Sequence, residues 1–338
     1  MGVNDLADKN VQVTLAKRPS GWVTEGDFKI VERDVPKPGA GQVLVRNLWL
    51  SLDPYMRGRM NDVKSYAASV QIGDVMVGGT AGEVVESNNP SFKKGDHVVG
   101  YYGWQQYGVS DGRELQKVDA KAAPLSAFLG TLGMPGLTAW FGLLDIGAPK
   151  PGETVVVSAA AGAVGSVVGQ IAKIKGCRAV GIAGGKDKCA HVVKDLGFDA
   201  CIDYKAGNLM KDLAEATPKG IDVYFENVGG DILEAVAMRL NPFARIPLCG
   251  LISQYNATQM HGLNNLVLLL INRVKLQGFI VSDYADRAPA ALAELVKWVA
   301  EGKIKYRETI ANGIENAPSA FIGMLKGANV GKQLVKLA

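Results

Sequence analysis

Apolar and polar positions alternate over short distances in the first third of the chain. The segments VQVTLA, FKIVERDVP, QVLVRNLWLSL and AGEVVES place apolar residues in alternation or in clusters of strand length. Turn-rich stretches such as PKPGAGQ and NNPSFKKGDH separate them, and KKGDHVVGY has the form of a tight turn leading into a strand. Residues 10–120 are therefore predicted to form a compact, partly open β-barrel with irregular loops.

The pattern changes at about Ala123, where apolar residues take helical spacing in AAPLSAFLGTLGMPGLTAWFGLLDIG. Strand-like runs then alternate with helical ones: TVVVSA and residues 164–174, RAVGIAG and DKCAHVVKDLG, CIDY and residues 209–216, DVYFENVGG and residues 231–240, with RIPLCGLIS and LQGFIV beyond them. This alternation predicts an α/β region built on a doubly wound parallel sheet that is covered on both faces.

Two segments near the end of the chain complete the organisation. Residues 290–301 are predicted to form a helix with one apolar face, made by Leu292, Leu295, Val296 and Val299. The final ANVGKQLVKLA is strand-like and can rejoin the β-rich region. We therefore predict a discontinuous β-rich domain, residues 1–125 and 305–338, and an α/β domain, residues 126–304.

The stretch TVVVSAAAGAVGSVVGQIAK, residues 154–173, is the candidate nucleotide site. A strand leads into a turn with Ala160, Gly162 and Gly165 at the spacing of the dinucleotide fingerprint, alanine replacing the first glycine. Ala163 and Val164 complete the turn, and a helix with an apolar stripe follows. Small residues allow backbone N–H groups and the helix N-terminus to approach a pyrophosphate. The alternative is an ordinary tight turn in a core rich in small residues.

The end of the next strand indicates which dinucleotide is bound. NAD binders carry an acidic residue there for the ribose hydroxyl, whereas this chain has IAGGKDK, with Gly184 followed by Lys186 and Lys188. Small residues leave room for a 2′-phosphate and lysines supply positive charge, so NADP(H) is favoured. Asp187 is better explained as an N-terminal helix charge. The alternative for both lysines is a solvated loop.

Composition excludes several classes of function. The net charge of +4 over 338 residues is too small and too dispersed to indicate nucleic acid or a membrane surface as partner. The longest aliphatic run, residues 266–271, is far shorter than a membrane span. The polar N-terminus lacks a signal-peptide core, and Gly2 does not open a convincing myristoylation signal. A cytoplasmic protein is expected.

Cysteine and histidine positions do not indicate a metal site. Cys177, Cys189, Cys201 and Cys249 lie in or beside apolar segments without metal-ligand spacing, and are expected to be buried free thiols. The three histidines, at positions 97, 191 and 261, do not form a ligand set by spacing.

Longer motifs carry a family resemblance over essentially the whole chain. They are LSLDPYMRGRM, GMPGLTAWFGL, SAAAGAVGSVVGQIAK, FENVGGDIL, CGLISQYN, LQGFIVSDY, EGKIKY and NVGKQLV. In these the chain resembles the medium-chain dehydrogenase/reductase superfamily, and specifically its zinc-independent branch of alkenal and prostaglandin-type double-bond reductases. The resemblance implies a GroES-like catalytic domain beside a Rossmann domain, NADPH in the cleft between them, and a homodimer.

The resemblance also assigns cofactor contacts. Lys188 and Tyr204 match positions at the adenosine 2′-phosphate, next to Gly184. The positions that match the nicotinamide end are Asn227, Phe279 with the neighbouring backbone at Val281, and Asn329. Tyr255 is a further candidate there, because its phenol could bond the nicotinamide ribose hydroxyl. Each has an ordinary alternative: Phe279 as a core residue, Asn227 as a turn residue and Asn329 as a cap.

Departures from the zinc-dependent alcohol dehydrogenases are equally informative. Those enzymes hold a catalytic zinc through an early cysteine and a His-Glu pair, but residues 50–60 and 77–82 of this chain contain neither Cys nor His. No cluster of four cysteines is present for a structural zinc. No zinc is therefore expected.

Reduction of a double bond conjugated to a carbonyl fits this resemblance. Hydride would pass to the β-carbon, and the protein would position both reactants and donate a hydrogen bond to the enolate oxygen. Tyr255 is the first candidate donor and Tyr55 the second, although a tyrosine is more often a packed aromatic. Arg57 and Arg59 could attract an acidic substrate group, or serve the structure alone.

The function predicted from the sequence is NADPH-dependent reduction of small α,β-unsaturated aldehydes and ketones, enals and enones. Two alternatives stay open. One is a zinc-free NADPH quinone reductase of the same superfamily, and the other is a non-enzymatic NADPH-binding protein.

Overall fold

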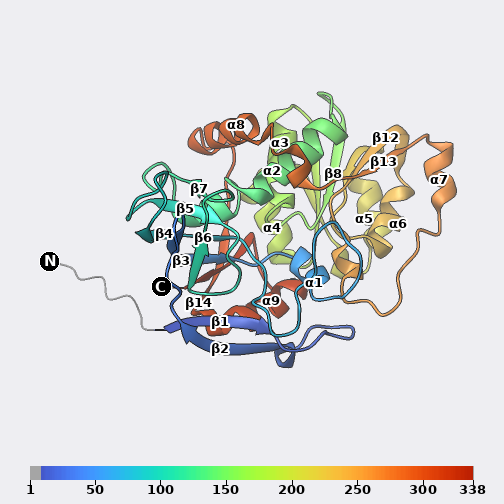
Figure 1. The fold of residues 1–338 in the computed structure, drawn as a ribbon. Helices are drawn as coiled ribbons and strands as arrows, with labels where there is room; N and C mark the ends of the chain where they lie inside the picture. The colour runs from blue at the N-terminus through green and yellow to red at the C-terminus, as the bar shows by residue number, and fades with distance from the viewer. Residues whose placement is uncertain (1–8, 338) are drawn as a thin grey trace. The chain divides into compact units, whose positions relative to one another are not determined.

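The computed structural model describes residues 9–337 of the chain (Figure 1). The sequence prediction about Gly2 lies outside the described residues. The chain forms two compact units. Unit 1 comprises the chain up to Leu129, Thr309–Ala328 and the residues from Gln333 onward, and unit 2 comprises Gly130–Glu308 and Asn329–Lys332.

Unit 1 is built on a seven-stranded sheet with the order β14-β15-β3-β4-β5-β7, in which β6 also pairs with β3. Its strands are β3 (Val43–Ser51), β4 (Thr80–Ser87), β5 (His97–Gly100), β6 (Tyr107–Ser110), β7 (Gln116–Lys117), β14 (Glu308–Asn312) and β15 (Lys332–Lys336). A separate pair joins β1 (Lys9–Leu15) to β2 (Phe28–Asp34). The helices are the short α1 (Tyr55–Arg59) and α9 (Ala317–Leu325), with 3-10 turns at Glu25–Asp27, Leu125–Leu129 and Ile314–Asn316. The predicted β-rich region is confirmed.

An aromatic group forms the centre of unit 1. The rings of Phe28 and Trp104 stack at 5.4 Å between centroids, and Phe321 of α9 meets Trp104 edge-on at 5.5 Å. The C-terminal strand β15 pairs antiparallel with β3, Leu334 opposite Ser51. The last residues of the chain therefore return to the β-rich unit, as their strand pattern indicates.

Unit 2 is a six-stranded parallel sheet with the order β10-β9-β8-β11-β12-β13. Its strands are β8 (Thr154–Ser158), β9 (Arg178–Ala183), β10 (Ala200–Asp203), β11 (Ile221–Phe225), β12 (Leu240–Leu248) and β13 (Lys275–Gly278). Its helices, which flank the sheet in Figure 1, are α2 (Met134–Phe141), α3 (Gly165–Ile174), α4 (Lys186–Lys194), α5 (Leu209–Ala216), α6 (Gly230–Ala237), α7 (Leu266–Ile271) and α8 (Ala288–Ala300). The predicted α/β architecture is confirmed, and the strand order is that of a doubly wound dinucleotide fold.

The sequence of β8 explains its central place. Val155, Val156 and Val157 are all fully buried, so both faces of this strand are covered, as a parallel sheet requires. The helix that follows it is also more deeply buried than its apolar stripe predicts. Ser166, Gly169 and Gln170 of α3 are buried together with Val167, Val168 and Ile171, because α3 is enclosed on several sides rather than on one.

Several predicted elements differ in detail. The buried face of α8 is Ala291, Leu295 and Trp298, whereas Val296, which we placed on that face, is 42% exposed. The helix predicted for residues 231–240 ends at Ala237, since β12 already begins at Leu240. The apolar run after Ala123 forms a 3-10 turn, α2 and then a π-helix at Gly142–Gly147, an element that the sequence pattern does not show.

The four cysteines are free, but only Cys177 is buried, and Cys189, Cys201 and Cys249 are half-buried. Within residues 9–337, no helix is long and apolar enough to cross a membrane.

Candidate active site

The order of strands in unit 2 identifies the edge of the sheet where a ligand binds. Strand order reverses between β8 and β11, and in open parallel sheets ligands bind at the carboxyl ends of the strands at such a switch point. The predicted glycine turn follows β8, and Asn227 follows β11. Two predicted site segments that are distant in sequence therefore meet at one place.

The turn after β8 is closed by sterically demanding contacts. Ala159 adopts a left-handed conformation with φ of 51°, and its carbonyl oxygen accepts a hydrogen bond of 2.9 Å from the N–H of Gly162. A Cβ at Gly165 would lie 2.4 Å from the same oxygen, a distance that side chains do not tolerate. Gly165 is thus required for the turn itself, which brings the N-terminus of α3 to the switch point.

Alanine in the first fingerprint position has a partner that explains it. A Cβ added to Gly181 of β9 would lie 2.7 Å from the Cβ of Ala160. The glycine in β9 therefore provides the space that the methyl group of Ala160 occupies, and the departure from the glycine pattern is compensated across the two strands.

The end of β9 forms a small cationic site. Burial, followed by the charge of Lys205, lowers the pKa of Lys188 from its ordinary value. The carboxylate of Asp203 accepts hydrogen bonds from the N–H groups of Gly185 and Lys205, at 2.7 and 3.0 Å, and so fixes both loops. Two neighbouring ammonium groups would be stabilised by a bound dianion, which fits the 2′-phosphate of NADPH.

The same site places the other predicted adenosine residues. A Cβ at Gly184 would lie 2.9 Å from the hydroxyl of Tyr204, which is 42% exposed. Lys186 is exposed, whereas Lys188 is half-buried beside Lys205. Sequence reasoning had not considered Lys205, although it follows directly on Tyr204 in the motif IDYK.

Asn227 is held at the end of β8 by two bonds. Its N–H donates to the hydroxyl of Ser158 at 2.9 Å, and its side-chain amide donates to the carbonyl oxygen of Ser158 at 2.8 Å. Asn227 is thus a turn residue, as the alternative had it, and it also lies at the edge where the ligand would bind.

Tyr255 follows a loop that begins at the end of β12. The N–H of Leu251 donates a hydrogen bond of 3.3 Å to its hydroxyl oxygen. A Cβ at Gly250 would lie 2.9 Å from the same oxygen and 3.6 Å from the carbonyl oxygen of Asn227. The structure therefore brings the hydroxyl of Tyr255 and the carbonyl oxygen of Asn227 close to each other beside Gly250.

The remaining nicotinamide candidates lie on two other segments of unit 2. Phe279 is half-buried and meets the ring of Phe225 edge-on at 6.3 Å between centroids, while Val281 begins the following 3-10 turn. Asn329 donates from its side chain to the carbonyl oxygen of Gly331, whose N–H donates to Ala161 of the glycine turn at 2.7 Å. Asn329 is therefore connected to the turn that would hold the pyrophosphate.

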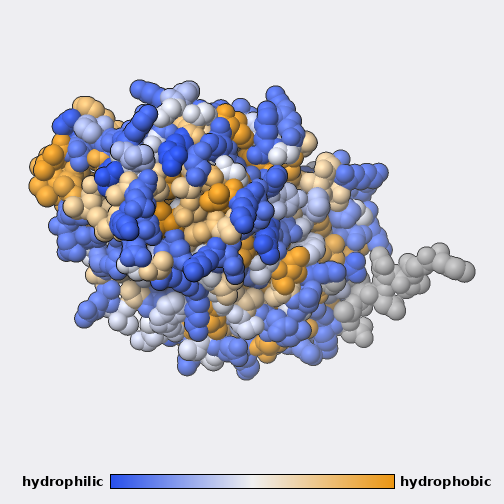
Figure 2. All heavy atoms as spheres, turned by 180° about the vertical axis from the view of Figure 1, so that it is seen from behind, coloured by the Kyte–Doolittle hydropathy of each residue, from blue (hydrophilic) through white to orange (hydrophobic). Residues whose placement is uncertain are grey.

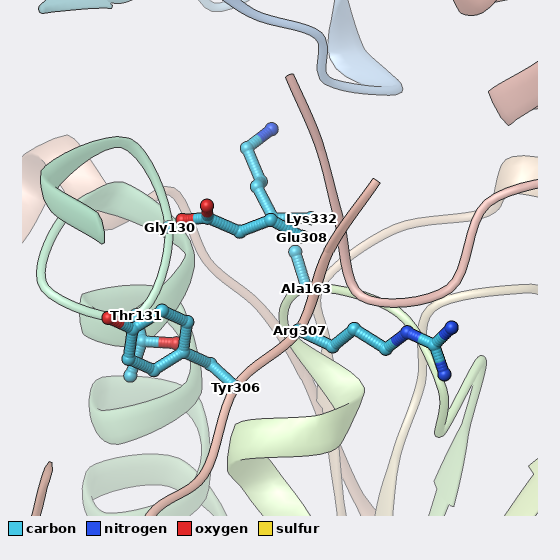
Figure 3. Close-up of a pocket in the computed structure, with 7 residues that line it drawn as sticks. All are labelled: Gly130, Thr131, Ala163, Tyr306, Arg307, Glu308 and Lys332. Atoms are coloured by element: carbon cyan, nitrogen blue, oxygen red, sulfur yellow. The ribbon is translucent and has the colours of Figure 1, made fainter. Parts of the chain in front are cut away.

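A hollow lies beside this turn (Figure 3). It is lined by Gly130, Thr131, Ala163, Tyr306, Arg307, Glu308 and Lys332. Figure 3 shows Tyr306 lying beside Thr131, with the side chain of Arg307 directed away from it.

Tyr55 lies in unit 1, at the start of α1. Burial, followed by the charge of Asp53, raises its pKa well above the ordinary value, so the phenol stays protonated and can donate. Arg57 donates to the carbonyl oxygen of Gly21 at 2.9 Å, and Arg59 to that of Ala67 at 2.8 Å. Both arginines are buried, so they serve the local structure rather than attract a substrate.

Comparison with known proteins decides the family. Residues 11–118 match a family model described as the N-terminal domain of oxidoreductase, and residues 163–301 match one described as zinc-binding dehydrogenase. The chain is 53% identical to NADPH-dependent curcumin reductase of Escherichia coli (strain K12), covering 98% of this chain and 97% of that protein. It is 43% identical to 2-alkenal reductase (NADP(+)-dependent) of Nicotiana tabacum, covering 97% and 98%.

The chain belongs to the zinc-independent alkenal and prostaglandin reductase branch of the medium-chain dehydrogenase/reductase superfamily. Prostaglandin reductase 1 of Mus musculus is 46% identical, over 96% of this chain and 98% of that one. Among solved structures, CurA from Vibrio vulnificus in complex with NADPH has a TM-score of 0.94 at 52% identity, over 97% of this chain and 99% of that chain.

The second family model is described as zinc-binding dehydrogenase, so we ask whether this chain has a zinc site. Within the described part of the chain, no three His, Cys, Asp or Glu side chains are grouped as metal ligands would be. His191 of α4, for example, is hydrogen-bonded to Asp195 at 2.7 Å, just after the end of the helix. The expectation that the chain binds no zinc stays a prediction.

Proposed function

We propose that this chain uses NADPH to reduce the carbon–carbon double bond of α,β-unsaturated aldehydes and ketones. The chain is an oxidoreductase, since curcumin, 2-alkenal and prostaglandin reductases match it over nearly its full length. The observation that supports this substrate class is the hydroxyl of Tyr255, which lies next to Asn227 at the carboxyl edge of the parallel sheet.

NADP(H) is the cofactor. The closed turn at Gly162 and Gly165 fits its pyrophosphate, and Lys188 with Lys205 and Tyr204 fits its 2′-phosphate. When bound, NADPH supplies the hydride that reduces the β-carbon of the substrate. We keep Asn227, Phe279, Val281 and Asn329 as the residues at its nicotinamide end.

The protein's own part in the reaction is to hold the substrate carbonyl and stabilise the charge that moves onto its oxygen. Tyr255 donates a hydrogen bond to that oxygen, a contribution worth about 3 kcal/mol of barrier, or roughly 10² in rate. Tyr55 of unit 1 is the second candidate donor. A hydroxyl that gives up its proton here can also relay it to the α-carbon.

The test is turnover of a short panel of enones and enals by purified protein. Oxidation of NADPH is followed at 340 nm, and the product is identified by NMR as the saturated carbonyl compound. Tyr255→Phe is expected to lower kcat about 10²-fold. If Tyr255→Phe lowers kcat less than Tyr55→Phe does, Tyr55 is the main donor and Tyr255 the second. If the wild type reduces no enone, the proposal is wrong.

Quinone reduction is the alternative that the same assay decides. Quinone oxidoreductase of Escherichia coli has a TM-score of 0.78 but only 22% identity, so this likeness shows the fold alone. Rapid turnover of quinones without turnover of enones would favour that activity. The third possibility in the sequence, a non-enzymatic binding protein, is not retained because the relatives are reductases.

We further propose that unit 2 pairs with a second copy of the chain. Strand β13 is an edge of its sheet, and neighbouring apolar side chains are exposed: Phe243, Leu266, Val267, Leu270 and Ile271. Figure 2 shows apolar residues gathered at this edge, over α7. Leu270, at 75% exposure, is the most exposed of these residues, so Leu270→Asp is expected to convert a dimer to monomers in light scattering. A wild-type monomer would contradict this proposal.

Two further expectations stay predictions. The functional domains are assigned to residues 1–125 with 305–338 and to residues 126–304, and the protein is expected in the cytoplasm.

A further inference from the structure

A buried carboxyl group lies directly behind the candidate nicotinamide site. Glu226 follows β11 and is fully buried, as are Tyr224 and Ser158 beside it. An acidic side chain is rarely buried completely unless other groups satisfy it. The role proposed above for Asn227 and Tyr255 does not use this residue, so its burial calls for a separate explanation.

One carboxylate oxygen of Glu226 accepts hydrogen bonds from three surrounding donors. Its Oε1 accepts hydrogen bonds from the hydroxyl of Ser158 at 2.9 Å, the hydroxyl of Tyr224 at 3.0 Å and the N–H of Val228 at 2.6 Å. Its Oε2 has no hydrogen-bond partner among residues 9–337. Burial raises the pKa of this carboxyl group, although the hydrogen bonds that it accepts lower it.

These bonds enclose Asn227 from both sides. The hydroxyl of Ser158 that donates to Glu226 also accepts the N–H of Asn227 at 2.9 Å. On the other side, the N–H that reaches Oε1 belongs to Val228, the next residue in the chain. A change at Oε1 would therefore move the backbone of Asn227 directly.

Main-chain hydrogen bonds also connect Glu226 and Asn227 to the loop that carries Tyr255. The carbonyl oxygen of Glu226 accepts N–H bonds from Cys249 at 2.9 Å and Gly250 at 3.2 Å. The carbonyl oxygen of Asn227 accepts the N–H of Ile252 at 3.1 Å. Asn227 and the loop of Tyr255 are thus fixed to the same short segment that follows β11.

We propose that Glu226 is a positioning residue, whose buried carboxyl group holds Asn227 and the loop of Tyr255 in the geometry needed at the nicotinamide end of the cofactor. This inference rests on the proposed function. Displacement of reacting groups by about 1 Å can cost about 10² in rate, so a residue that touches neither substrate nor cofactor can control turnover.

The experiment compares variants at the two ends of the same strand. Glu226→Gln keeps an oxygen acceptor at Oε1, and Glu226→Ala removes it. Ser158→Ala removes the hydroxyl that joins Oε1 to the N–H of Asn227, and keeps the carbonyl oxygen that accepts the side-chain amide of Asn227. The matched control is Asp222→Asn. Asp222 also joins β11 to β8, accepting the N–H of Thr154 at 2.8 Å, but at the amino ends of the strands.

Three experiments are made on each variant. Thermal unfolding gives the melting temperature, titration with NADPH gives Kd and the fluorescence of the bound dihydronicotinamide, and steady-state kinetics give kcat and KM for an enone. For Glu226→Ala and Ser158→Ala we expect kcat to fall to about one tenth of the wild-type value or below. We also expect the fluorescence of bound NADPH to change. The Kd for NADPH should stay within about threefold, because the phosphate sites lie elsewhere. Glu226→Gln and Asp222→Asn should keep kcat within about twofold, even where they melt earlier.

The outcomes separate the proposal from its alternatives. If Ser158→Ala has the kcat and the NADPH fluorescence of the wild type, the positioning role of Glu226 is overturned. This test remains decisive even where Glu226→Ala does not fold. An equal loss of kcat in Asp222→Asn would overturn the role too, because any weakening of the sheet would then suffice. If the wild type reduces no enone, the proposed function fails, and unchanged fluorescence of bound NADPH in the two alanine variants would still overturn the positioning role.

Discussion

Replacing Gly165 by alanine should damage both the fold and the binding of NADPH. The added Cβ would lie 2.4 Å from the carbonyl oxygen of Ala159, whereas ordinary contacts begin at 3.4 Å, so the turn must open by about 1 Å. Overpacking of this kind costs about 1–3 kcal/mol. If NADPH binds only to the closed turn, its binding must supply the energy of about 1–3 kcal/mol needed to close the turn against the added methyl group. Kd for NADPH then rises about 5- to 140-fold.

Two other glycines separate the effects on stability and on binding. A Cβ at Gly169, also in α3, would lie 1.8 Å from the ring of Phe198, away from the turn, so Gly169→Ala should lower the melting temperature and leave Kd unchanged. A Cβ at Gly162 meets only the oxygen of Ala159, at 3.1 Å. Gly162→Ala should therefore melt nearly as the wild type does and yet bind NADPH more weakly, because its methyl group enters the space of the pyrophosphate.

Calorimetric titration with NADPH and thermal unfolding of the three variants decide the matter. If Gly162→Ala binds NADPH as the wild type does, the pyrophosphate does not lie against this turn. If Gly169→Ala weakens binding as much as Gly165→Ala, general loss of packing explains both, and the steric reasoning for the turn is wrong.

Three further predictions concern charge and titration. Lys188→Ala and Lys205→Ala should each raise Kd for NADPH about tenfold and leave binding of NADH unchanged, with a smaller effect at high salt, in parallel titrations of both cofactors; equal losses for both cofactors would contradict a 2′-phosphate site. Because the pKa of Lys188 in the unliganded protein lies below its ordinary 10.5, its charge is present below the lowered pKa and lost above it, so titrations at rising pH should show NADPH affinity falling before pH 10.5. Burial raises the pKa of the Cys177 thiol to about 11 and that of Cys249 to about 12, so neither should react with a disulfide reagent at pH 8 until the protein is unfolded. Peptide mapping tells them from Cys189 and Cys201, and fast labelling of Cys177 or Cys249 in the folded protein would contradict this prediction.

The stretch from Thr154 to Ile174 could be predicted because its structure depends on its own residues. Four β-favouring residues and a helical stripe are local patterns. Gly165 must lack a side chain because the carbonyl oxygen of Ala159, only six residues away, occupies the space of a Cβ. By contrast, the space for Ala160 is provided by Gly181 on another strand, and the sequence gives no sign of that pairing.

The packing face of α8 shows how a local pattern can mislead. Hydrophobicity favours Leu292 and Val296, yet the helix buries Ala291 and Trp298 on either side of Leu295. The reason lies in the partner, because a Cβ at Gly136 of α2 would lie 3.2 Å from a methyl group of Leu295. Close approach at a glycine turns the helix so that its small and aromatic residues face inward, which no period of the helix itself encodes.

Asp222 and Glu226 make the same point for the candidate site. Four residues apart, both bridge from the β11 segment to β8, and by composition alone each would be expected on the surface. Only the parallel order of the strands places Asp222 at the amino ends and Glu226 at the carboxyl ends, where ligands bind. Residues whose role follows from their own backbone, such as Gly165, are thus accessible to sequence reasoning. Glu226 takes its role from Ser158, 68 residues earlier in the chain, and becomes visible only when the sheet has brought the two strands together.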